Sequence, residues 1–156
     1  MRALAPDVRI PPVFERTFFI TTVALQRAGF FRSRAFAELF VETLYDYRKQ
    51  GKYLLHEFVL MPDHLHLILT PDAHISLERA MQFIKGGFAY RANQELREGR
   101  TWQPGFDNHR IRDDEDYQRH RTYIHMNPVK VGLVQKASDH PYSSANPKFV
   151  LDEVPA

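Results

Sequence analysis

The segment 61–70, Met-Pro-Asp-His-Leu-His-Leu-Ile-Leu-Thr, constrains the fold of this chain more than any other stretch. After a Pro-Asp turn, leucine occupies every second position from 65 to 69. Because successive side chains of a strand point to opposite faces, the leucines predict one buried face, and His64 and His66 share the other. Two imidazoles on one face of a rigid strand are well placed to share one divalent cation.

A His-x-His pair also arises by chance, with one histidine in solvent and the other hydrogen-bonded in the core. Taken alone, the pair favours that interpretation. The apolar neighbours change the balance, because polar side chains in an apolar strand are costly unless they have partners. Asp63, directly before the strand, is interpreted as the turn residue in preference to a carboxylate that supports a metal ligand.

Hydrophobic spacing and turn residues predict the elements of the first half of the chain. Residues 17–25 are rich in β-branched and aromatic side chains and predict a strand. Ser33 is a candidate N-cap for a helix that Gly51 ends. Tyr53–Leu60 predicts a second strand, which the turn at 61–63 joins to the histidine strand as an antiparallel hairpin.

The second half contains two further helices. Ser76 starts one of them, in which Gly86-Gly87 costs about 1 kcal/mol per glycine relative to alanine and predicts a kink or a close backbone approach. Residues 99–106 are expected to form a loop or a short strand. The last helix begins in the acidic run 113–116, as the helix dipole favours, and is expected to end near Met126, ahead of an Asn-Pro pair.

This order of elements predicts an α+β fold of the ferredoxin-like type, an antiparallel sheet with helices packed on one face. The 156 residues, 44% hydrophobic and 26% charged, suit a single domain of a soluble protein. We expect an extended lead-in at 1–12, one domain at 13–145 and a tail at 146–156.

Composition excludes several classes of protein. No apolar run reaches membrane-spanning length, and the first residues lack the layout of a signal peptide. The absence of cysteine excludes a disulfide scaffold and thiolate zinc sites, so a reducing cytoplasm is expected. The formal net charge of +2 gives little general argument for nucleic acid.

A tyrosine and an asparagine in the last helix form a second candidate constellation. Tyr123 and Asn127 are four residues apart and share one helical face. A tyrosine hydroxyl can act as a nucleophile, and the Asn127 oxygen with two imidazoles would make an open three-ligand site suited to Mg²⁺ or Mn²⁺. The alternative is that Tyr123 is a half-buried packing residue and Asn127 a C-cap; the spacing alone favours that alternative.

Positive charge gathers in the second half beside aromatic residues, as in grooves that hold single-stranded nucleic acid. A run of charge is more often a solvated helix face, and the acidic residues 113–116 partly offset this one. The candidate DNA-binding residues are Lys85, Arg91, Trp102, Arg110, Arg112, Arg119, Arg121 and Lys130. His109, His120 and His125 are interpreted as surface or packing histidines rather than ligands.

Several motifs occur here in the order of a known group. The segment Val59–His66 resembles the His-hydrophobic-His motif of single-tyrosine HUH transposases. The motifs that resemble the REP-associated tyrosine transposases within that group are Trp102–Phe106, His109–Arg112, Tyr117, Tyr123–Lys130 and, with its first two residues transposed, Pro141–Ser144. Gly105 and His125 depart from the pattern, but neither belongs to the implied chemistry.

The resemblance, which spans roughly residues 14–145, implies a HUH endonuclease fold that acts on single-stranded DNA at hairpins of repeated palindromic elements. It implies that His64 and His66 bind the metal, that Tyr123 is the nucleophile and that Asn127 is the third ligand. The cation would act as a Lewis acid on the scissile phosphate. Attack by tyrosine would give a 5′-phosphotyrosyl link and a free 3′-hydroxyl, and a second 3′-hydroxyl could reverse the link without ATP.

The sequence therefore predicts a metal-dependent enzyme of DNA transposition that nicks and rejoins DNA. A non-cleaving nucleic-acid-binding or regulatory protein of the same fold is the alternative, and a small hydrolase with no use for Tyr123 is a third possibility. We expect a cytoplasmic protein, associated with the nucleoid when it binds DNA, with no membrane partner. A monomer is expected, with a dimer as the alternative.

Overall fold

The computed structural model describes residues 13–155, so the expected lead-in at 1–12 lies outside the described residues. The strands and helices in chain order are β1 (Phe18–Val23), α1 (Arg34–Lys49), β2 (Tyr53–Met61), β3 (His64–Pro71), α2 (Leu77–Leu96), β4 (Asp107–Arg110) and α3 (Asp114–Lys130). Short 3-10 turns occupy Leu25–Arg27, Phe30–Arg32 and Ala137–Asp139.

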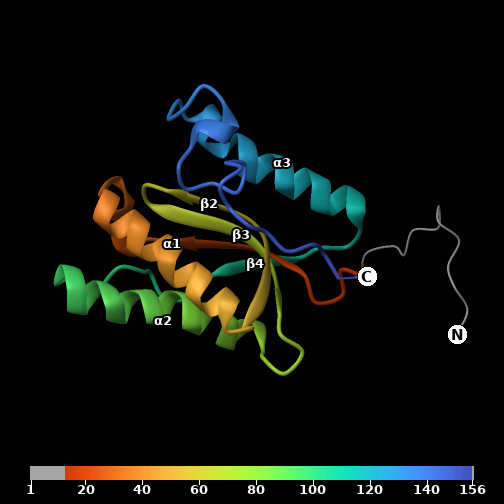
Figure 1. The fold of residues 1–156 in the computed structure, drawn as a ribbon, viewed down its shortest axis with the longest axis horizontal. Coiled ribbons are helices and arrows are strands. Elements are labelled where there is room, and N and C mark those ends of the chain that lie inside the picture. The colour runs from red at the N-terminus through yellow and green to blue at the C-terminus, as the bar shows by residue number, and fades with distance from the viewer. Residues whose placement is uncertain (1–12, 156) are drawn as a thin grey trace, which may run out of the picture.

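The four strands form one antiparallel sheet in the order β2-β3-β1-β4 (Figure 1). The predicted hairpin is present, with Met61 paired to His64 across the Pro-Asp turn. Together with the order βαββαβ, this confirms the α+β, ferredoxin-like fold that the sequence predicts. β3, which carries the histidine pair, lies between β2 and β1.

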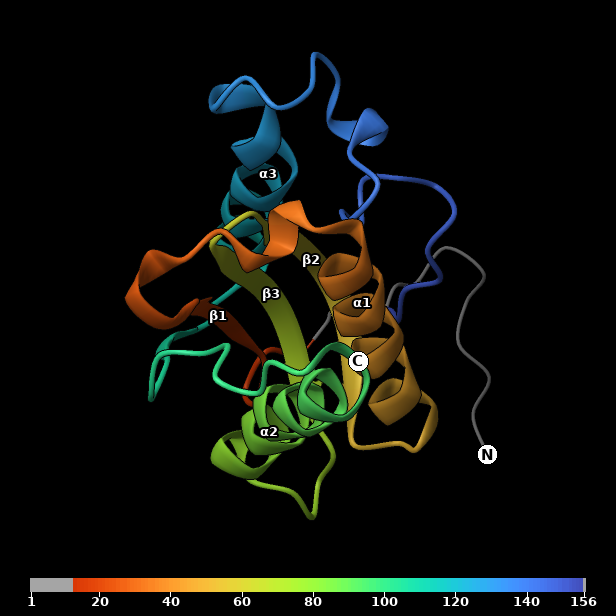
Figure 2. The ribbon, with the colours of Figure 1, turned by 90° about the vertical axis from the view of Figure 1, so that its left-hand side faces the viewer.

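Helices cover both faces of the sheet (Figures 1 and 2). α1 and α2 pack together on one face, as expected, and there the leucines of β3 are buried with Phe40 and Phe88. α3 lies on the opposite face, where its Ile124 packs with Val59 and Ile68. The expectation of helices on one face therefore holds for α1 and α2 and is corrected for α3.

The signals for the helix N-termini are confirmed. The Ser33 side chain accepts a hydrogen bond from the Phe36 N–H, and Ser76 accepts one from the Arg79 N–H at 3.1 Å. Gly51, just beyond α1, has φ of +77°, the left-handed conformation that favours glycine.

One predicted boundary is wrong. α3 continues through Pro128 to Lys130 instead of ending near Met126. Pro128 is buried and cannot donate the helix hydrogen bond to the Ile124 carbonyl, yet the helix continues past it. Its own carbonyl accepts from the Leu133 N–H at 2.9 Å, just beyond the helix end. Of the two alternatives predicted for 99–106, the structure shows the loop, with a single bridge between Ala24 and Trp102, and the last strand follows it at 107–110.

The described part of the expected tail packs against the domain. Phe149 stacks on Tyr45 with ring centroids 5.7 Å apart, and Asp152 accepts two hydrogen bonds from the Arg48 guanidinium. Before it, the Ser144 N–H donates to the Phe58 carbonyl and covers the outer edge of β2. Among residues 13–155, no helix is both long enough and apolar enough to cross a membrane.

The glycine pair in α2 does not interrupt the helix, and Gly87 marks the close approach that the sequence predicts. A Cβ at Gly87 would lie 2.5 Å from Tyr47 Oη on α1, whereas a Cβ at Gly86 would meet no atom within 4 Å. Tyr47 is itself held against Phe83, with ring centroids 5.2 Å apart. The two helices therefore approach closely only because residue 87 has no side chain.

Gly87→Ala should lower the free energy of unfolding by about 1–3 kcal/mol, because the new methyl group overpacks the α1–α2 contact. Gly86→Ala is the matched control and should raise it by about 0.5–1 kcal/mol, because alanine loses less conformational entropy in a helix. Urea unfolding of both variants measures the difference. Equal effects of the two substitutions would contradict the close approach.

Candidate functional site

The two histidines of β3 face the α3 side of the sheet with their ring centroids 4.8 Å apart. His64 Nδ1 donates to Asp63 Oδ1 at 2.7 Å, and His66 Nδ1 is hydrogen-bonded to Thr21 Oγ1 at 2.8 Å. Within residues 13–155, neither Nε2 atom has a hydrogen-bond partner. Metal-binding histidines are commonly oriented in this way, through a bond made by the other ring nitrogen.

Asp63 therefore does more than form the turn, which corrects the preferred interpretation of the sequence. Burial raises the pKa of its carboxyl, but the bonds from His64 and Arg27 outweigh that effect, so the pKa lies below its ordinary value.

His66 has a strongly lowered pKa. Its burial and, second, the charge of the neighbouring His64 together lower the pKa of His66 to about 3. His66 is thus neutral near pH 7, the form that binds a metal.

α3 brings Tyr123 to this pair. Its ring centroid lies 5.2 Å from that of His66 and 6.1 Å from that of Phe19, and the Phe19 ring stacks on His66 at 5.4 Å. The Tyr123 side chain is nevertheless 45% exposed, so a substrate can reach it. Asn127 lies one turn further along α3 and is buried.

These residues suit a divalent cation. Two imidazoles present Nε2 atoms on one face, and Asn127 offers an amide oxygen on the helix that covers that face. His64 and His66 would hold the ion, with Asn127 as the candidate third ligand. A site with so few protein ligands leaves positions open for phosphate oxygens.

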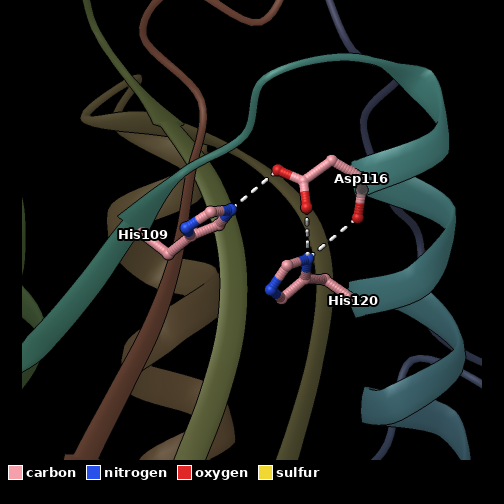
Figure 3. Close-up of side chains that lie close together, drawn as sticks. All are labelled: His109, Asp116 and His120. Carbon is pink, nitrogen blue, oxygen red and sulfur yellow. Dashed lines mark hydrogen bonds and ion pairs between the residues drawn. The ribbon is translucent and has the colours of Figure 1, made fainter.

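A second cluster joins β4 to α3 (Figure 3). His109 Nε2 lies 2.7 Å from Asp116 Oδ2, and His120 Nδ1 lies 3.3 Å from Asp116 Oδ1 and donates to the Asp116 carbonyl at 2.8 Å. The metal-binding atoms of the three residues lie within 4.8 Å of one another, so this group could also hold an ion. The sequence offered one signal for this cluster, because Asp116 and His120 are four residues apart and so share one face of a helix. The acidic run that contains Asp116 was interpreted only as the start of that helix.

The protein already satisfies the charge of Asp116, which is 1% exposed. Its carboxylate also accepts from the Arg112 N–H at 3.0 Å and from the Arg119 guanidinium at 3.1 Å. Burial raises the pKa of Asp116, but the bonds from His109, Arg112 and Arg119 outweigh it and hold the pKa well below its ordinary value. The Arg112 guanidinium also lies 3.6 Å from this carboxylate, and two guanidinium groups at one carboxylate favour a structural role for this cluster over metal binding.

Asp116→Asn should lower the free energy of unfolding at pH 7 by about 3 kcal/mol, because it removes one member of a buried ionic network. Because the pKa of Asp116 is lowered in the folded state, this carboxyl takes up a proton at a higher pH in the unfolded chain than in the folded protein. Wild-type stability should therefore fall as the pH drops below about 4, and this fall should be smaller in Asp116→Asn. Thermal unfolding from pH 3 to 7 tests both, with the exposed Asp114→Asn as control. Parallel pH profiles for Asp116→Asn and wild type would contradict this role.

A buried glutamate fixes α3 on β2. Glu57 Oε1 accepts from His125 Nε2 at 2.6 Å and from the Ser144 hydroxyl at 2.7 Å, and Arg121 Nε lies 3.4 Å from Glu57 Oε2. Arg121 and His125 stand two residues before and after Tyr123, so their bonds to Glu57 hold the helix on both sides of the tyrosine. Glu57 was absent from the residues that the sequence singled out, because it belongs to no recognisable chemical pattern. Ser144 was named only as the last residue of the Pro141–Ser144 motif, without a role.

The predicted DNA-binding residues lie on different parts of the molecule. Arg110, Arg112, Arg119, Arg121 and Lys130 come from β4, α3 and their connection, near Tyr123 in the chain. Lys85 and Arg91 belong to α2, on the opposite side of the sheet; Arg91 pairs with Asp46 at 2.7 Å, and the Lys85 ammonium donates to two loop carbonyls. The Trp102 ring packs among core aromatics, 5.1 Å from Phe31. DNA binding by this set stays a prediction.

Comparisons with known proteins place the chain in a family. A family model described as "Transposase IS200 like" matches residues 13–127. The REP-associated tyrosine transposase of Escherichia coli (strain K12) is 33% identical over 98 residues, 62% of this chain and 57% of that protein. A protein of Haemophilus influenzae named for the same group is 38% identical over 96 residues, 54% of each chain.

A solved structure has the same fold. The REP-associated tyrosine transposase bound to a REP hairpin matches with a TM-score of 0.70 at 24% identity, over 97% of this chain and 93% of that one. Fold and site thus define a ferredoxin-like protein whose paired histidines face a tyrosine borne by a helix. The chain belongs to the IS200-like transposase family, and the names of its relatives confirm the resemblance to REP-associated tyrosine transposases. It spans a little over half the length of the curated relatives it matches.

Proposed function

We propose that this chain is a metal-dependent endonuclease and strand transferase for single-stranded or hairpin DNA. The observation that carries the proposal is the approach of the Tyr123 ring to His66, beside His64. A nucleophile candidate and a metal-site candidate thus meet at one exposed position. Membership of a transposase family and the DNA hairpin of the structural relative support this choice of substrate.

In the proposed reaction, the Tyr123 oxygen attacks the scissile phosphorus and releases its proton. The bond to the 3′ oxygen breaks, and this oxygen takes up a proton to leave a free 3′-hydroxyl. The products are a 5′-phosphotyrosyl link and that 3′-hydroxyl, so another 3′-hydroxyl can reverse the step. When bound, Mg²⁺ or Mn²⁺ would polarise a non-bridging phosphate oxygen. Phe19 and His66 hold the tyrosine ring at the site, which fixes the direction of attack.

Incubation of labelled hairpin DNA and Mn²⁺ with the protein, followed by a denaturing gel, tests the proposal. We expect a nicked strand and a labelled protein–DNA adduct. DNA binding without either product would favour a non-cleaving regulatory protein, and nicking without an adduct would favour a hydrolase that does not use Tyr123. The protein is proposed to act in the cytoplasm, at the nucleoid when bound to DNA.

We propose a monomer, because Tyr123 and His66 of the same chain already face each other and a partner need not donate the tyrosine. Sedimentation at micromolar concentration should give the mass of one chain, 18.3 kDa. Cleavage activity should then rise linearly with protein concentration. A stable dimer in the same range would overturn this assignment.

A further inference from the structure

A hollow of about 420 Å³ opens beside His64 and has no role in the proposed reaction. Its walls come from three separate parts of the chain: the turn before β3, the loop after β1, and the segment that follows α3. The lining residues are Arg27, Gly29, Arg32, Met61, Pro62, Asp63, His64, Val131 and Leu133. The volume is in the range of small-ligand sites.

Asp63 connects the hollow to the candidate metal site. One carboxylate oxygen accepts from His64 Nδ1 at 2.7 Å, and the other lies 3.3 Å from Arg27 Nη1. The Arg27 side chain remains 65% exposed, so its guanidinium can bind a further anion. One carboxylate therefore orients both a candidate metal ligand and a cation next to it.

The backbone that carries Arg27 is strained. Gln26 and Arg27 have φ of 54° and 52°, a left-handed conformation that is unfavourable for residues other than glycine. The neighbouring chain holds it in place, because the Ala24 N–H donates to the Asp63 carbonyl at 2.8 Å. Strain of this kind tends to occur where a side chain must be presented in one direction.

The two walls differ in chemistry. On one side, Arg32 adds a second guanidinium, and its side chain lies over Gly29, where a Cβ would be 3.3 Å from Arg32 Cδ. On the other side, Val131 and Leu133 are 62% and 47% exposed and offer apolar surface. Paired cations opposite apolar surface match a nucleotide, which carries a phosphate at one end and a flat base at the other.

We propose that this hollow binds the nucleotide next to the scissile phosphate, with its phosphate on Arg27 and Arg32 and its base against Val131 and Leu133. This inference rests on the proposed function, because a neighbouring nucleotide exists only if the DNA strand crosses the site beside His64. It assigns to the loop after β1 a share in recognising the single-stranded part of the substrate.

Equilibrium binding without divalent ions tests the inference independently of cleavage. The probes are a fluorescent DNA hairpin with single-stranded extensions at both ends and the same hairpin without extensions. Arg27→Met and Arg32→Met should each weaken binding of the extended hairpin about five- to tenfold and reduce the slope of log K against log salt by about 0.7. Arg27→Lys should restore most of that slope, because it keeps the charge. Arg79→Met, at the start of α2, is the matched control and should change neither value.

The blunt hairpin should bind all variants alike, within twofold. Leu133→Ser should weaken binding of the extended hairpin but not of one whose extensions are abasic, because only the base contacts the apolar wall. Equal losses for extended and blunt hairpins, or no loss, would overturn the inference while leaving the proposed function intact. Wild-type protein that binds neither hairpin would overturn both.

Discussion

His64→Ala and His66→Ala should each reduce cleavage of hairpin DNA about 10³-fold or more while leaving DNA affinity within a few fold. A bound cation contributes several kcal/mol of charge stabilisation to the transition state, and loss of a ligand removes that contribution. Affinity is spared because phosphate contacts elsewhere dominate it. Single-turnover assays with Mn²⁺ and fluorescence anisotropy measure the two quantities separately.

The second histidine cluster supplies the control. His109 could take part in an alternative metal site with Asp116 and His120, so His109→Ala removes one possible ligand there. If the ion binds at the β3 pair, His109→Ala should keep both the cleavage rate and the stoichiometry of Mn²⁺ binding, once unfolding curves show that the variant is folded. Loss of Mn²⁺ binding in His109→Ala but not in His66→Ala would move the metal site to the β4–α3 cluster.

Local periodicity was enough to predict the sheet and the direction of the histidines. The alternation at 61–70 has period two, and a Pro-Asp turn fixes its register, so the face of each residue follows from the sequence. The bond between Asp63 and His64 did not follow, because the direction of a turn side chain depends on backbone angles that composition does not reveal.

The position of α3 was harder to predict because its buried face is partly polar. Asp116 and Asn127 are buried there as well as Tyr117 and Ile124, and polar residues of this kind indicate a solvent-exposed face when only the sequence is known. The polar contact that fixes this helix on the sheet also involves a partner far away in the chain, because His125 pairs with Glu57. Such pairings are set by tertiary packing and leave no periodic signal.

Tertiary packing also places the predicted DNA-binding residues on different sides of the sheet. Arg91 and Trp102 were grouped with the residues of α3 because they are basic or aromatic and occur in the same half of the sequence. In the fold, Arg91 pairs with Asp46 of α1 and Trp102 packs on the opposite side of the sheet from α3. The prediction, which grouped residues by their nearness in the sequence, therefore overestimated how much of the positive charge lies on one surface.

Tyr123→Phe should abolish the covalent protein–DNA adduct while leaving DNA affinity and Mn²⁺ binding within about twofold of wild type. The substitution removes one oxygen atom and keeps the ring that contacts Phe19 and His66, so packing of α3 is preserved. Without that oxygen, no phosphotyrosyl bond can form. Denaturing gels with 5′- and 3′-labelled hairpins measure the adduct directly.

Two other tyrosines test whether the assignment is specific. Tyr90 is 69% exposed but belongs to α2, on the other side of the sheet from the histidine pair. Tyr117 lies on α3, but it is buried against Phe14, and burial raises the pKa of its hydroxyl, which disfavours the phenolate. Tyr90→Phe and Tyr117→Phe should therefore still form the adduct. A phosphotyrosyl peptide that contains Tyr90 or Tyr117 instead of Tyr123, identified by mass spectrometry, would refute the assignment.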